Sequence, residues 1–460
     1  MQSLSSPAAA IALLLTLCLG LALSERSASA DRLPNLIVIL SDDQGYRDTG
    51  FNGSKDIPTP HTDRIANEGV RFTNGYVTYA VCGPSRAGLI TGRYQDRFGA
   101  ILNPIVDPSV PNNGVPTSEK NIAELLKPLG YTTMTVGKWH LGTHPDLRPH
   151  VRGFDEFYGF LSGGHDYFPE NLTLEDLSEV DRQWAWYRTK LLHNGKRVGT
   201  DAYLTEELSD AAVDFIERKK DEPFFLYLSY NAPHTPMQAT DEDLARFSHI
   251  ENERRRTYAA MVASMDDGIG RVLDTLDELG LAEDTIVFFL SDNGGASNNA
   301  ANNWPLKGHK GSPHEGGLRV PFAVRWTGTY PAGVDFDHPV LALDIAGTIA
   351  GQAGASVPAD KPLDGVDLTP FLTGDNDGAP HDALYWRWYK AGRLVIRRGD
   401  HKLIVHGDNR QLYDLSADIG ESNNLIDANP QLADELQAEV EAWAEDMVGP
   451  IAPGLGSWKF

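Results

Sequence analysis

Two apolar runs far apart in the chain end in nearly the same polar sequence, and they restrict the fold strongly. Residues 35–40 (NLIVIL) are followed by SDD, and residues 285–290 (TIVFFL) are followed by SDN. A continuous apolar run of this length, bounded by polar residues, is typical of a strand buried on both faces of a parallel sheet. In open α/β sheets the functional site lies at the carboxyl ends of such strands. The pair therefore predicts an α/β fold with a site where the two strands end.

The polar residues after these strands bring three carboxylates and one amide to the predicted sheet edge. They are Asp42, Asp43, Asp292 and Asn293. Oxygen donors of this kind suit a hard cation such as Ca²⁺ or Mg²⁺. The alternative is that Asp and Asn only make turns or cap helices after strands, which is common. Because two strands share nearly the same ending, we favour a metal site.

Between the two runs, segments typical of strands and of helices alternate along the chain. Helices are predicted over residues 119–129, 205–219 and 254–280, and strands over residues 131–136 and 224–229. The long third helix has apolar side chains at the spacing of one helix face. This repeated order of strand, loop and helix indicates an α/β sandwich, in which helices cover a large, mostly parallel sheet.

The pattern changes after a flexible junction at residues 374–378 (GDNDG). Three segments beyond it alternate in the manner of short antiparallel strands, and a fourth resembles an acidic amphipathic helix. These segments are residues 384–389, 394–398, 402–406 and 432–447. We therefore expect a large catalytic unit over residues 31–374 and a smaller C-terminal α+β unit over residues 375–460.

The N-terminal residues 1–30 have the features of a secretory signal peptide. Residues 11–23 form an apolar run that is short for a bilayer span, and ASA at 28–30 fits a cleavage site. No Lys or Arg precedes the run, which leaves an uncleaved N-terminal anchor as the alternative. We expect an exported protein, periplasmic or secreted, without a membrane partner once the signal is cleaved.

The net charge of the chain argues against one broad class of function. The formal net charge is −24 at pH 7. A protein that binds nucleic acid is expected to carry a basic surface, so nucleic acid is not an expected partner. An anionic substrate would need a local basic pocket within an acidic surface.

Cys82 is the only cysteine left after cleavage of the predicted signal, because the other, Cys18, lies within it. Pro84 suits the first turn of a helix, so Cys82 is expected at or just before a helix N-terminus. Backbone N–H groups and the helix dipole favour an anion there, and Arg86 adds a cation one turn on. A free cysteine is usually a small buried apolar residue. A single cysteine retained in an oxidising compartment nevertheless favours a functional role.

Bases and cations follow the other predicted strands. Lys138 and His140 come after one strand, His234 follows another, and a glycine-rich loop at residues 307–321 contains Lys310. Each of these side chains, taken singly, is more often structural or solvated. Together with the metal-ligand candidates and the predicted helix start, they describe a site for a tetrahedral oxyanion at one edge of one sheet.

The sequence CGPSR at residues 82–86, continuing to TGR at residues 91–93, resembles the signature of the formylglycine-dependent sulfatases. These are the type I sulfatases of the alkaline-phosphatase-like superfamily. GKWH at 137–140, the loop at 310–317 and LYDL at 412–415 are similar to other blocks of the family. The resemblance covers nearly the whole mature chain and implies the alkaline-phosphatase-like fold with a smaller C-terminal unit.

The resemblance implies two unusual features of the site. A formylglycine-generating or sulfatase-maturing enzyme would oxidise Cys82 to formylglycine (3-oxoalanine). One hydroxyl of the aldehyde hydrate would then attack sulfur, and after the alcohol leaves, the second would expel sulfate. The resemblance also implies one Ca²⁺ per chain, held by Asp42, Asp43, Asp292 and Asn293 together with the modified Cys82.

The resemblance further implies a role for each cation and base near the nucleophile. Arg86 would hold the hydrate, and Lys138 would bridge to the sulfate oxygens. His140 would be the base that collapses the hydrate, while His234 and Lys310 would bind sulfate and assist the leaving oxygen. The metal and the cations would balance the charge on the sulfuryl group during transfer.

The alcohol part of the substrate is expected to be a carbohydrate. Residues 152–160 and 164–167 resemble segments of carbohydrate sulfatases. The side chains expected near the mouth of the site are Arg148, His165, Asp166, Trp304 and His309. Aromatic rings and hydrogen-bonding groups of this kind suit a sugar, although each can also be a loop residue without a ligand.

The sequence therefore predicts an exported carbohydrate sulfatase that acts on a sulfated oligosaccharide or polysaccharide. Two alternatives stay open. The first is an arylsulfatase, or a phosphate or phosphonate ester hydrolase, that uses the same site. The second is a binding protein without activity, which the retention of Cys82 and of every expected cation disfavours.

Overall fold

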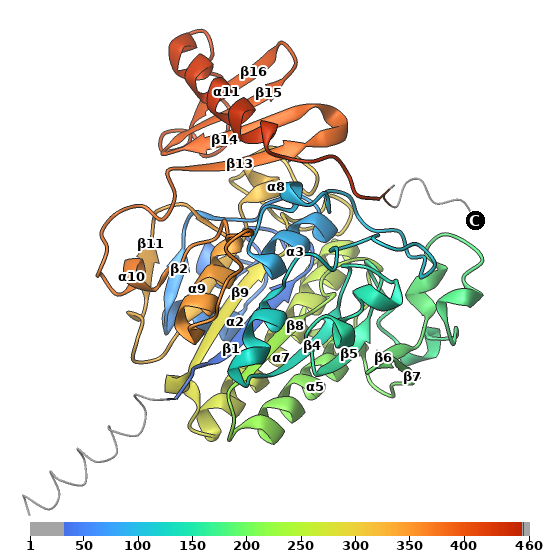
Figure 1. Cartoon of the computed structure of the whole chain (residues 1–460). Helices are drawn as coiled ribbons and strands as arrows, with labels where there is room; N and C mark the ends of the chain where they lie inside the picture. The colour runs from blue at the N-terminus through green and yellow to red at the C-terminus, as the bar shows by residue number, and fades with distance from the viewer. Residues whose placement is uncertain (1–31, 453, 455–460) are drawn as a thin grey trace, which may run out of the picture.

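The computed structural model describes residues 32–452 and residue 454 of the 460-residue chain (Figure 1). The predicted signal peptide at residues 1–30 lies outside these described residues. Within them, no helix combines the length and the apolar character needed to cross a membrane.

In the described part of the chain, ten strands form one large mixed sheet, in the order β11-β2-β10-β9-β1-β8-β4-β5-β6-β7. Their bounds are β1 (Asn35–Ser41), β2 (Val70–Phe72), β4 (Thr132–Lys138), β5 (Glu156–Phe160), β6 (Leu191–His193), β7 (Lys196–Val198), β8 (Phe224–Ser229), β9 (Thr285–Ser291), β10 (Phe322–Arg325) and β11 (Val334–Phe336). The central strands β9, β1, β8, β4 and β5 are parallel. Toward the edges, β10 and β6 pair in the antiparallel sense. The predicted α/β sheet is confirmed, with a parallel centre and mostly antiparallel pairs toward its edges, where only β11 and β2 pair in the parallel sense.

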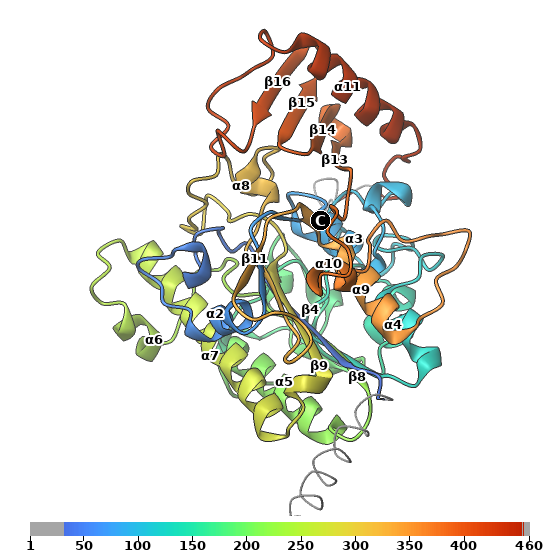
Figure 2. The same ribbon diagram turned by 90° about the vertical axis from the view of Figure 1, so that its left-hand side faces the viewer.

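Helices cover both faces of this sheet, which gives three layers (Figures 1 and 2). The helices are α2 (Pro60–Asn67), α3 (Cys82–Thr91), α4 (Ile122–Leu126), α5 (Leu204–Lys219), α7 (Glu253–Glu278) and α9 (Leu343–Ala353). Successive side chains of a strand point to opposite faces. Leu36 and Val38 of β1 accordingly pack in the core with α3, α4 and α9. Ile37 and Ile39 pack in the core with α2, α5 and α7. The apolar run is therefore buried on both sides, as its composition predicts.

The first of the predicted helices, over residues 119–129, is shorter than its pattern indicates. It begins at Ile122 because the side chain of Asn121 accepts the backbone N–H of Glu124, and Glu124 in return accepts that of Asn121. This reciprocal pair is a capping box, which marks a helix start. The last predicted turn is a 3₁₀ helix, η3 (Lys127–Leu129), that ends at Gly130 in the left-handed region.

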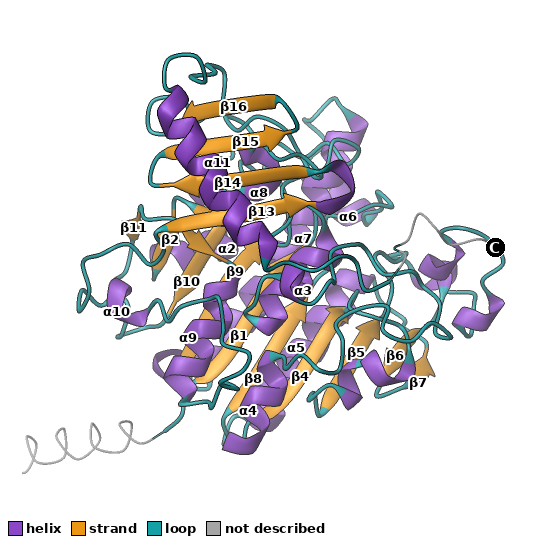
Figure 3. Ribbon diagram, turned by 45° about the horizontal axis from the view of Figure 1, so that its top comes forward, coloured by secondary structure: helices purple, strands orange, loops and turns teal. Residues whose placement is uncertain are grey.

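The C-terminal unit contains a four-stranded antiparallel sheet and one helix, as far as the described residues show (Figure 3). The elements are β13 (Ala383–Trp388), β14 (Arg393–Arg398), β15 (His401–His406), β16 (Asn409–Asp414) and α11 (Pro430–Glu445). Leu436 and Val440 of α11 pack on one face of this sheet. The predicted α+β architecture is confirmed, although β16 was not predicted because its first three residues are polar. The predicted boundary at residue 374 falls in the linker between α10 (Thr369–Leu372) and β13.

The other face of the C-terminal sheet packs on the large unit. Trp386 of β13 is fully buried there, and its indole N–H donates to the carbonyl of Val77 over 2.7 Å. Trp388 donates in the same way to the carbonyl of Gly311 over 3.2 Å. Four further short strands and α-helices are β3 (Gly75–Tyr76), β12 (Val340–Leu341), α6 (Asp241–Arg246) and α8 (Glu315–Leu318).

A buried cluster of charges, here called the junction cluster, links the two units. It consists of Glu315, Lys402 and Glu421, none of which is exposed to solvent. Lys402 Nζ lies 2.8 Å from Glu315 Oε1 and 3.0 Å from Glu421 Oε1. Glu421 also accepts the backbone N–H of Glu315 over 2.7 Å. The cluster thus joins the C-terminal sheet to the loop at residues 307–321, which carries Lys310.

Candidate active site

The carboxyl ends of β9, β1, β8 and β4 lie side by side at one edge of the sheet. Ser41 at the end of β1 is paired with Ser291 at the end of β9, so Asp42 and Asp292 leave the sheet together. The backbone N–H of Asp292 donates to the carbonyl of Ser41 over 3.0 Å, which holds the two chain segments in this register. The structure therefore brings together the residues that follow the two similar strands.

These residues form a buried group of oxygen donors. Ligand atoms of Asp42, Asp292 and Cys82 lie within 4.8 Å of one another. Asp42 Oδ1 and Asn293 Oδ1 are buried and have no hydrogen-bond partner among the described residues. Burial and the neighbouring Asp292 raise the pKa of Asp42 to about 7. Buried carboxylates with free oxygens are the donor set of a cation site, so these residues fit a bound metal ion.

Two fully buried cations oppose the carboxylates of this group. Arg86 comes from α3, and its Nε lies 2.8 Å from Asp292 Oδ2 while its Nη2 lies 3.7 Å from Asp42 Oδ2. Lys138 is the last residue of β4, and its ammonium group also pairs with Asp42. Both side chains are completely buried. Because a buried charge needs a partner, the cations and carboxylates hold each other in place.

Cys82 is the first residue of α3, as its neighbours in the sequence predict. Its Sγ lies 3.8 Å from Lys310 Nζ and 3.9 Å from Asn103 Oδ1. Asn103 also accepts the backbone N–H of Gly83 over 2.9 Å, which satisfies a free donor of the first helical turn. Burial raises the pKa of the Cys82 thiol. No sequence pattern pointed to Asn103, which lies in an irregular loop.

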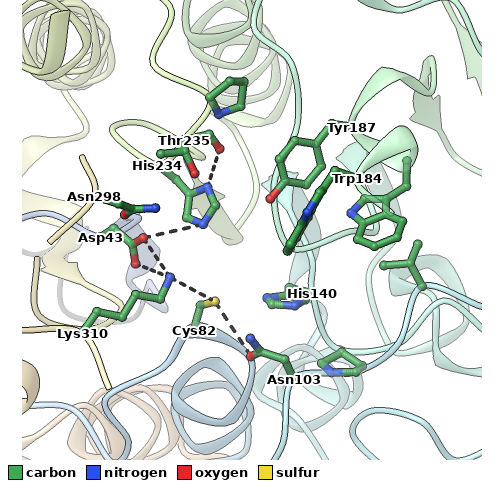
Figure 4. A pocket seen from close by; sticks show the side chains of 15 residues that line it. Asp43, Cys82, Asn103, His140, Trp184, Tyr187, His234, Thr235, Asn298 and Lys310 are labelled. Carbon is green, nitrogen blue, oxygen red and sulfur yellow. Dashed lines mark hydrogen bonds and ion pairs between the residues drawn. The ribbon is translucent and has the colours of Figure 1, made fainter. Parts of the chain in front are cut away.

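Lys310 and His234 lie on either side of Asp43 (Figure 4). Lys310 Nζ is 2.6 Å from Asp43 Oδ1, and His234 Nε2 is 3.6 Å from Asp43 Oδ2. Burial would raise the pKa of Asp43, but Lys310 and His234 lower it below the usual value. Burial lowers the pKa of His234 to about 3. His234 Nδ1 lies 2.6 Å from the carbonyl of Thr235, so the neutral ring carries its proton there and presents Nε2 as an acceptor.

His140 follows β4 with a positive φ of 55°, which turns its ring into the pocket. Burial and the nearby Lys138 hold its pKa well below the usual value, so the ring is neutral at pH 7. His140 Nδ1 is buried without a partner among the described residues. A Cβ at Gly163 would lie 2.7 Å from His140 Nε2, so only glycine leaves room for the ring.

One pocket of about 630 Å³ is lined by part of this site, namely Asp43, Cys82, Asn103, His140, His234 and Lys310 (Figure 4). Asp43, His234 and Lys310 form one side, with Cys82 beside them, and an aromatic side lies across the pocket. That aromatic side consists of Trp184, Trp186 and Tyr187. The sequence pattern did not point to these residues, although WAWY at 184–187 stands out in a polar stretch.

The five side chains expected near the mouth lie in the described part of the chain, and none of them lines this pocket. His165 is fully buried, and its two ring nitrogens contact the carbonyls of Asp166 and Thr189, which leaves neither for a ligand. The Asp166 carboxylate accepts from the Gln238 amide over 2.8 Å.

The other three of these side chains also have neighbours. Arg148 Nε donates to the carbonyl of Thr143 over 3.1 Å. Trp304 is 62% exposed and lies against the guanidinium of Arg47 at 4.0 Å. His309 is exposed, with Nδ1 2.9 Å from the carbonyl of Lys310. A role for these residues in substrate binding stays a prediction.

Solved structures with this architecture include sulfatases. The crystal structure of Ps i-CgsB in complex with k-i-k-neocarrahexaose is similar with a TM-score of 0.86 and 42% identity, over 91% of this chain and 94% of that one. The PsFucS1 sulfatase from Pseudoalteromonas sp. is similar with a TM-score of 0.79 and 26% identity, over 92% of each chain. The fold is thus that of the alkaline-phosphatase-like sulfatases, as expected.

Sequence comparisons agree with the fold. A family model described as Sulfatase matches residues 34–355, and one described as N-sulphoglucosamine sulphohydrolase, C-terminal, matches residues 309–446. Human N-acetylgalactosamine-6-sulfatase is 33% identical over 473 aligned residues, 93% of this chain and 89% of that protein. The chain belongs to the sulfatase family and is a type I sulfatase, a hydrolase of sulfuric esters. The family resemblance of the CGPSR stretch is confirmed.

Proposed function

We propose that this sulfatase removes sulfate from a sulfated oligosaccharide or polysaccharide outside the cytoplasm. The observation that carries the proposal is the pocket itself, which has a cationic and acidic side around Cys82 and an aromatic side across from it. The first side suits a sulfate group, and the second suits the flat apolar face of a sugar ring.

The metal site is part of this proposal. Asp42, Asp43, Asp292 and Asn293 would hold one Ca²⁺, since their buried and partly unpaired oxygens match the hard-donor set that Ca²⁺ prefers. A bound ion would supply charge stabilisation for the sulfuryl oxygens and the nucleophile.

We also propose that a maturing enzyme converts Cys82 to formylglycine. The aldehyde hydrate would supply two hydroxyls, which a thiol lacks. Position 82 suits such a group because it lies in the pocket wall, at a helix start, within reach of Lys310 and Asn103. Arg86 would orient the group from the buried side, where its guanidinium is already held by Asp292.

The remaining side chains would bind the sulfate and move protons. Lys138 and Lys310 carry positive charge beside Cys82 and would hold the sulfate oxygens. His140 and His234 are neutral at pH 7 because burial lowers the pKa of both rings. A neutral ring has one nitrogen that accepts a proton, which is what a general base requires. His140 would serve the nucleophile, and His234 with Lys310 would serve the leaving oxygen.

The carbohydrate part of the proposal draws support from relatives. The names of human N-acetylgalactosamine-6-sulfatase and of the Ps i-CgsB complex with k-i-k-neocarrahexaose both refer to sugars. A sulfated glycan therefore agrees both with these similarities and with the aromatic side of the pocket.

The experiment is a substrate panel with protein that has been co-expressed with a maturing enzyme. The panel contains position-defined sulfated oligosaccharides, 4-nitrophenyl sulfate, 4-nitrophenyl phosphate and a phosphonate monoester, with release of sulfate or product measured in parallel. We expect the highest kcat/KM on one of the sulfated oligosaccharides. Aryl sulfates or phosphorus esters that are far better substrates than every glycan would overturn the proposal in favour of those substrates.

A further inference from the structure

The aromatic side of the pocket belongs to the long connection between β5 and β6. Trp184 precedes a short 3₁₀ helix, η8 (Ala185–Arg188), and Trp186 and Tyr187 lie within it. Trp186 is 1% exposed and packs with Val106 and Leu177 in a small core of its own, separate from the two cores of the sheet. The segment is thus built on a fixed base, which a preorganised binding surface requires.

Trp184 is not explained by packing in that core. Its side chain is 49% exposed, and its backbone has a φ of 70°, a conformation that residues with a side chain seldom adopt. Its ring centre lies 5.3 Å from that of Trp186 and 5.7 Å from that of Tyr187. The Trp184 ring therefore packs against two other aromatic rings and remains accessible from the pocket that it lines.

Trp184 and Tyr187 lie across the pocket from Asp43, His234 and Lys310 (Figure 4). Burial raises the pKa of Tyr187, so its hydroxyl is neutral at pH 7 and can donate a hydrogen bond. A sulfate held beside Cys82 would occupy only the charged side. The organic part of the ester would then extend toward the two rings.

We infer that Trp184 is a specificity-determining residue that stacks on a sugar ring of the glycan next to the sulfated unit. Tyr187 would donate a hydrogen bond to the same part of the substrate. The inference rests on the proposed function, and it adds that the enzyme recognises at least two sugar units. It therefore predicts a preference for a sulfated oligosaccharide over the sulfated monosaccharide of the same sugar.

The test compares the wild type with Trp184→Ala, on the sulfated hexasaccharide that the wild type hydrolyses best in the panel and on the corresponding sulfated monosaccharide. For Trp184→Ala we expect KM on the hexasaccharide to rise about tenfold, the size of a lost aromatic contact. We expect kcat on the hexasaccharide and kcat/KM on the monosaccharide to change less than about threefold. Trp184→Phe, which keeps a flat ring, should restore most of the hexasaccharide KM.

The matched control is Tyr389→Ala. Tyr389 is also 49% exposed but lies in the C-terminal unit, outside the pocket lining, so its loss should leave both substrates unaffected. An unchanged hexasaccharide KM in Trp184→Ala overturns the inference. An equal fall in kcat/KM on the hexasaccharide and on the monosaccharide also overturns it, because that result would indicate a structural role. A wild type that hydrolyses no sulfated glycan would instead refute the proposed function.

Discussion

At the scale of single residues, the site depends on the absence of a side chain at Gly163 as well as on the polar side chains around it. The ring of His140 occupies space that a Cβ at Gly163 would fill. Gly163 has no positive φ, so alanine is compatible with its backbone, and the conflict is with the ring alone.

Gly163→Ala should therefore lower kcat by about 10- to 100-fold while the protein still folds, because small displacements of a catalytic group cost rate. The measurement is steady-state sulfate release together with the melting temperature. Gly199→Ala is the control, since nothing lies within 4 Å of a Cβ there and its activity should equal that of the wild type. Wild-type turnover in Gly163→Ala would contradict a role for the His140 position.

Cys82→Ser keeps the size of the residue and one hydroxyl, but it offers no thiol to be oxidised by an enzyme that acts on cysteine. We expect the variant to fold, to bind metal and substrate, and to release essentially no sulfate. Sulfate release is measured beside the wild type, with peptide mass spectrometry at position 82. Full activity in wild-type protein whose residue 82 is shown to be unoxidised would refute the formylglycine proposal.

Asp292→Asn keeps the shape of a metal-ligand candidate and removes its charge. The proposal predicts a loss of bound Ca²⁺ and a fall in activity of at least about 100-fold, because loss of a direct ligand charge should cost no less than loss of a residue that only orients a ligand. Metal content by mass spectrometry is the readout. Asp335→Asn is the control, because Asp335 is an exposed carboxylate elsewhere that pairs with Arg71. Undiminished activity in metal-free Asp292→Asn would refute the metal site.

At the scale of elements, the linker to the C-terminal unit is fixed to α9. His381 Nε2 lies 2.8 Å from Asp344 Oδ1 at the start of that helix. Burial would lower the pKa of His381, but the charge of Asp344, with smaller contributions from Asp364 and Asp382, raises it above the usual value of 6.5. A histidine whose pKa is higher in the folded state stabilises the protein fully at pH values below its unfolded-state pKa. This stabilisation is lost as the pH rises through the folded-state pKa.

The free energy of unfolding should therefore fall as pH rises above about 6.5. The decrease should be larger in the wild type than in His381→Gln, which cannot titrate at that position. Chemical denaturation across pH 6 to 8 measures both. Identical pH profiles for the two proteins would show that the pair does not contribute.

The sequence predicted well those elements whose own composition determines their structure and burial. The runs at 35–40 and 285–290 are apolar throughout, so β1 and β9 form where their composition indicates. Pro84 similarly marks the start of α3. β16 was missed because its first residues are polar, and it forms a strand only through its backbone pairing with β15. Trp184 and Asn103 were missed because only the folded loops bring them to the pocket that contains Cys82. His165 was expected near the mouth from the resemblance to carbohydrate sulfatases, and its ring is buried between two backbone carbonyls.

At the scale of the whole molecule, the junction cluster is the feature that ties the two units together. Lys402→Met removes the cation between Glu315 and Glu421 and leaves two buried carboxylates facing each other. Breaking a buried pair in this way costs about 3–5 kcal/mol. We expect a loss of stability of that size, and lower activity, because Glu315 lies in the loop that carries Lys310.

Denaturant unfolding and sulfate release measure the two effects. The control is Arg398→Met, which removes an exposed cation that pairs with Glu435 and Glu439 on the surface of the same unit. Arg398→Met should lower the free energy of unfolding by no more than about 1 kcal/mol. Equal stabilities of the two variants would contradict the importance of the junction cluster.

The loop that carries Lys310 is anchored by residues that the ribosome adds much later. Trp388 donates to the carbonyl of Gly311, and Lys402 and Glu421 hold Glu315. A nascent chain that already contains every residue of the pocket therefore still lacks the anchors of one of its sides. We therefore expect a premature stop codon after residue 374 to spare all of the pocket residues and still lower sulfate release, because Trp388, Lys402 and Glu421 would be lost.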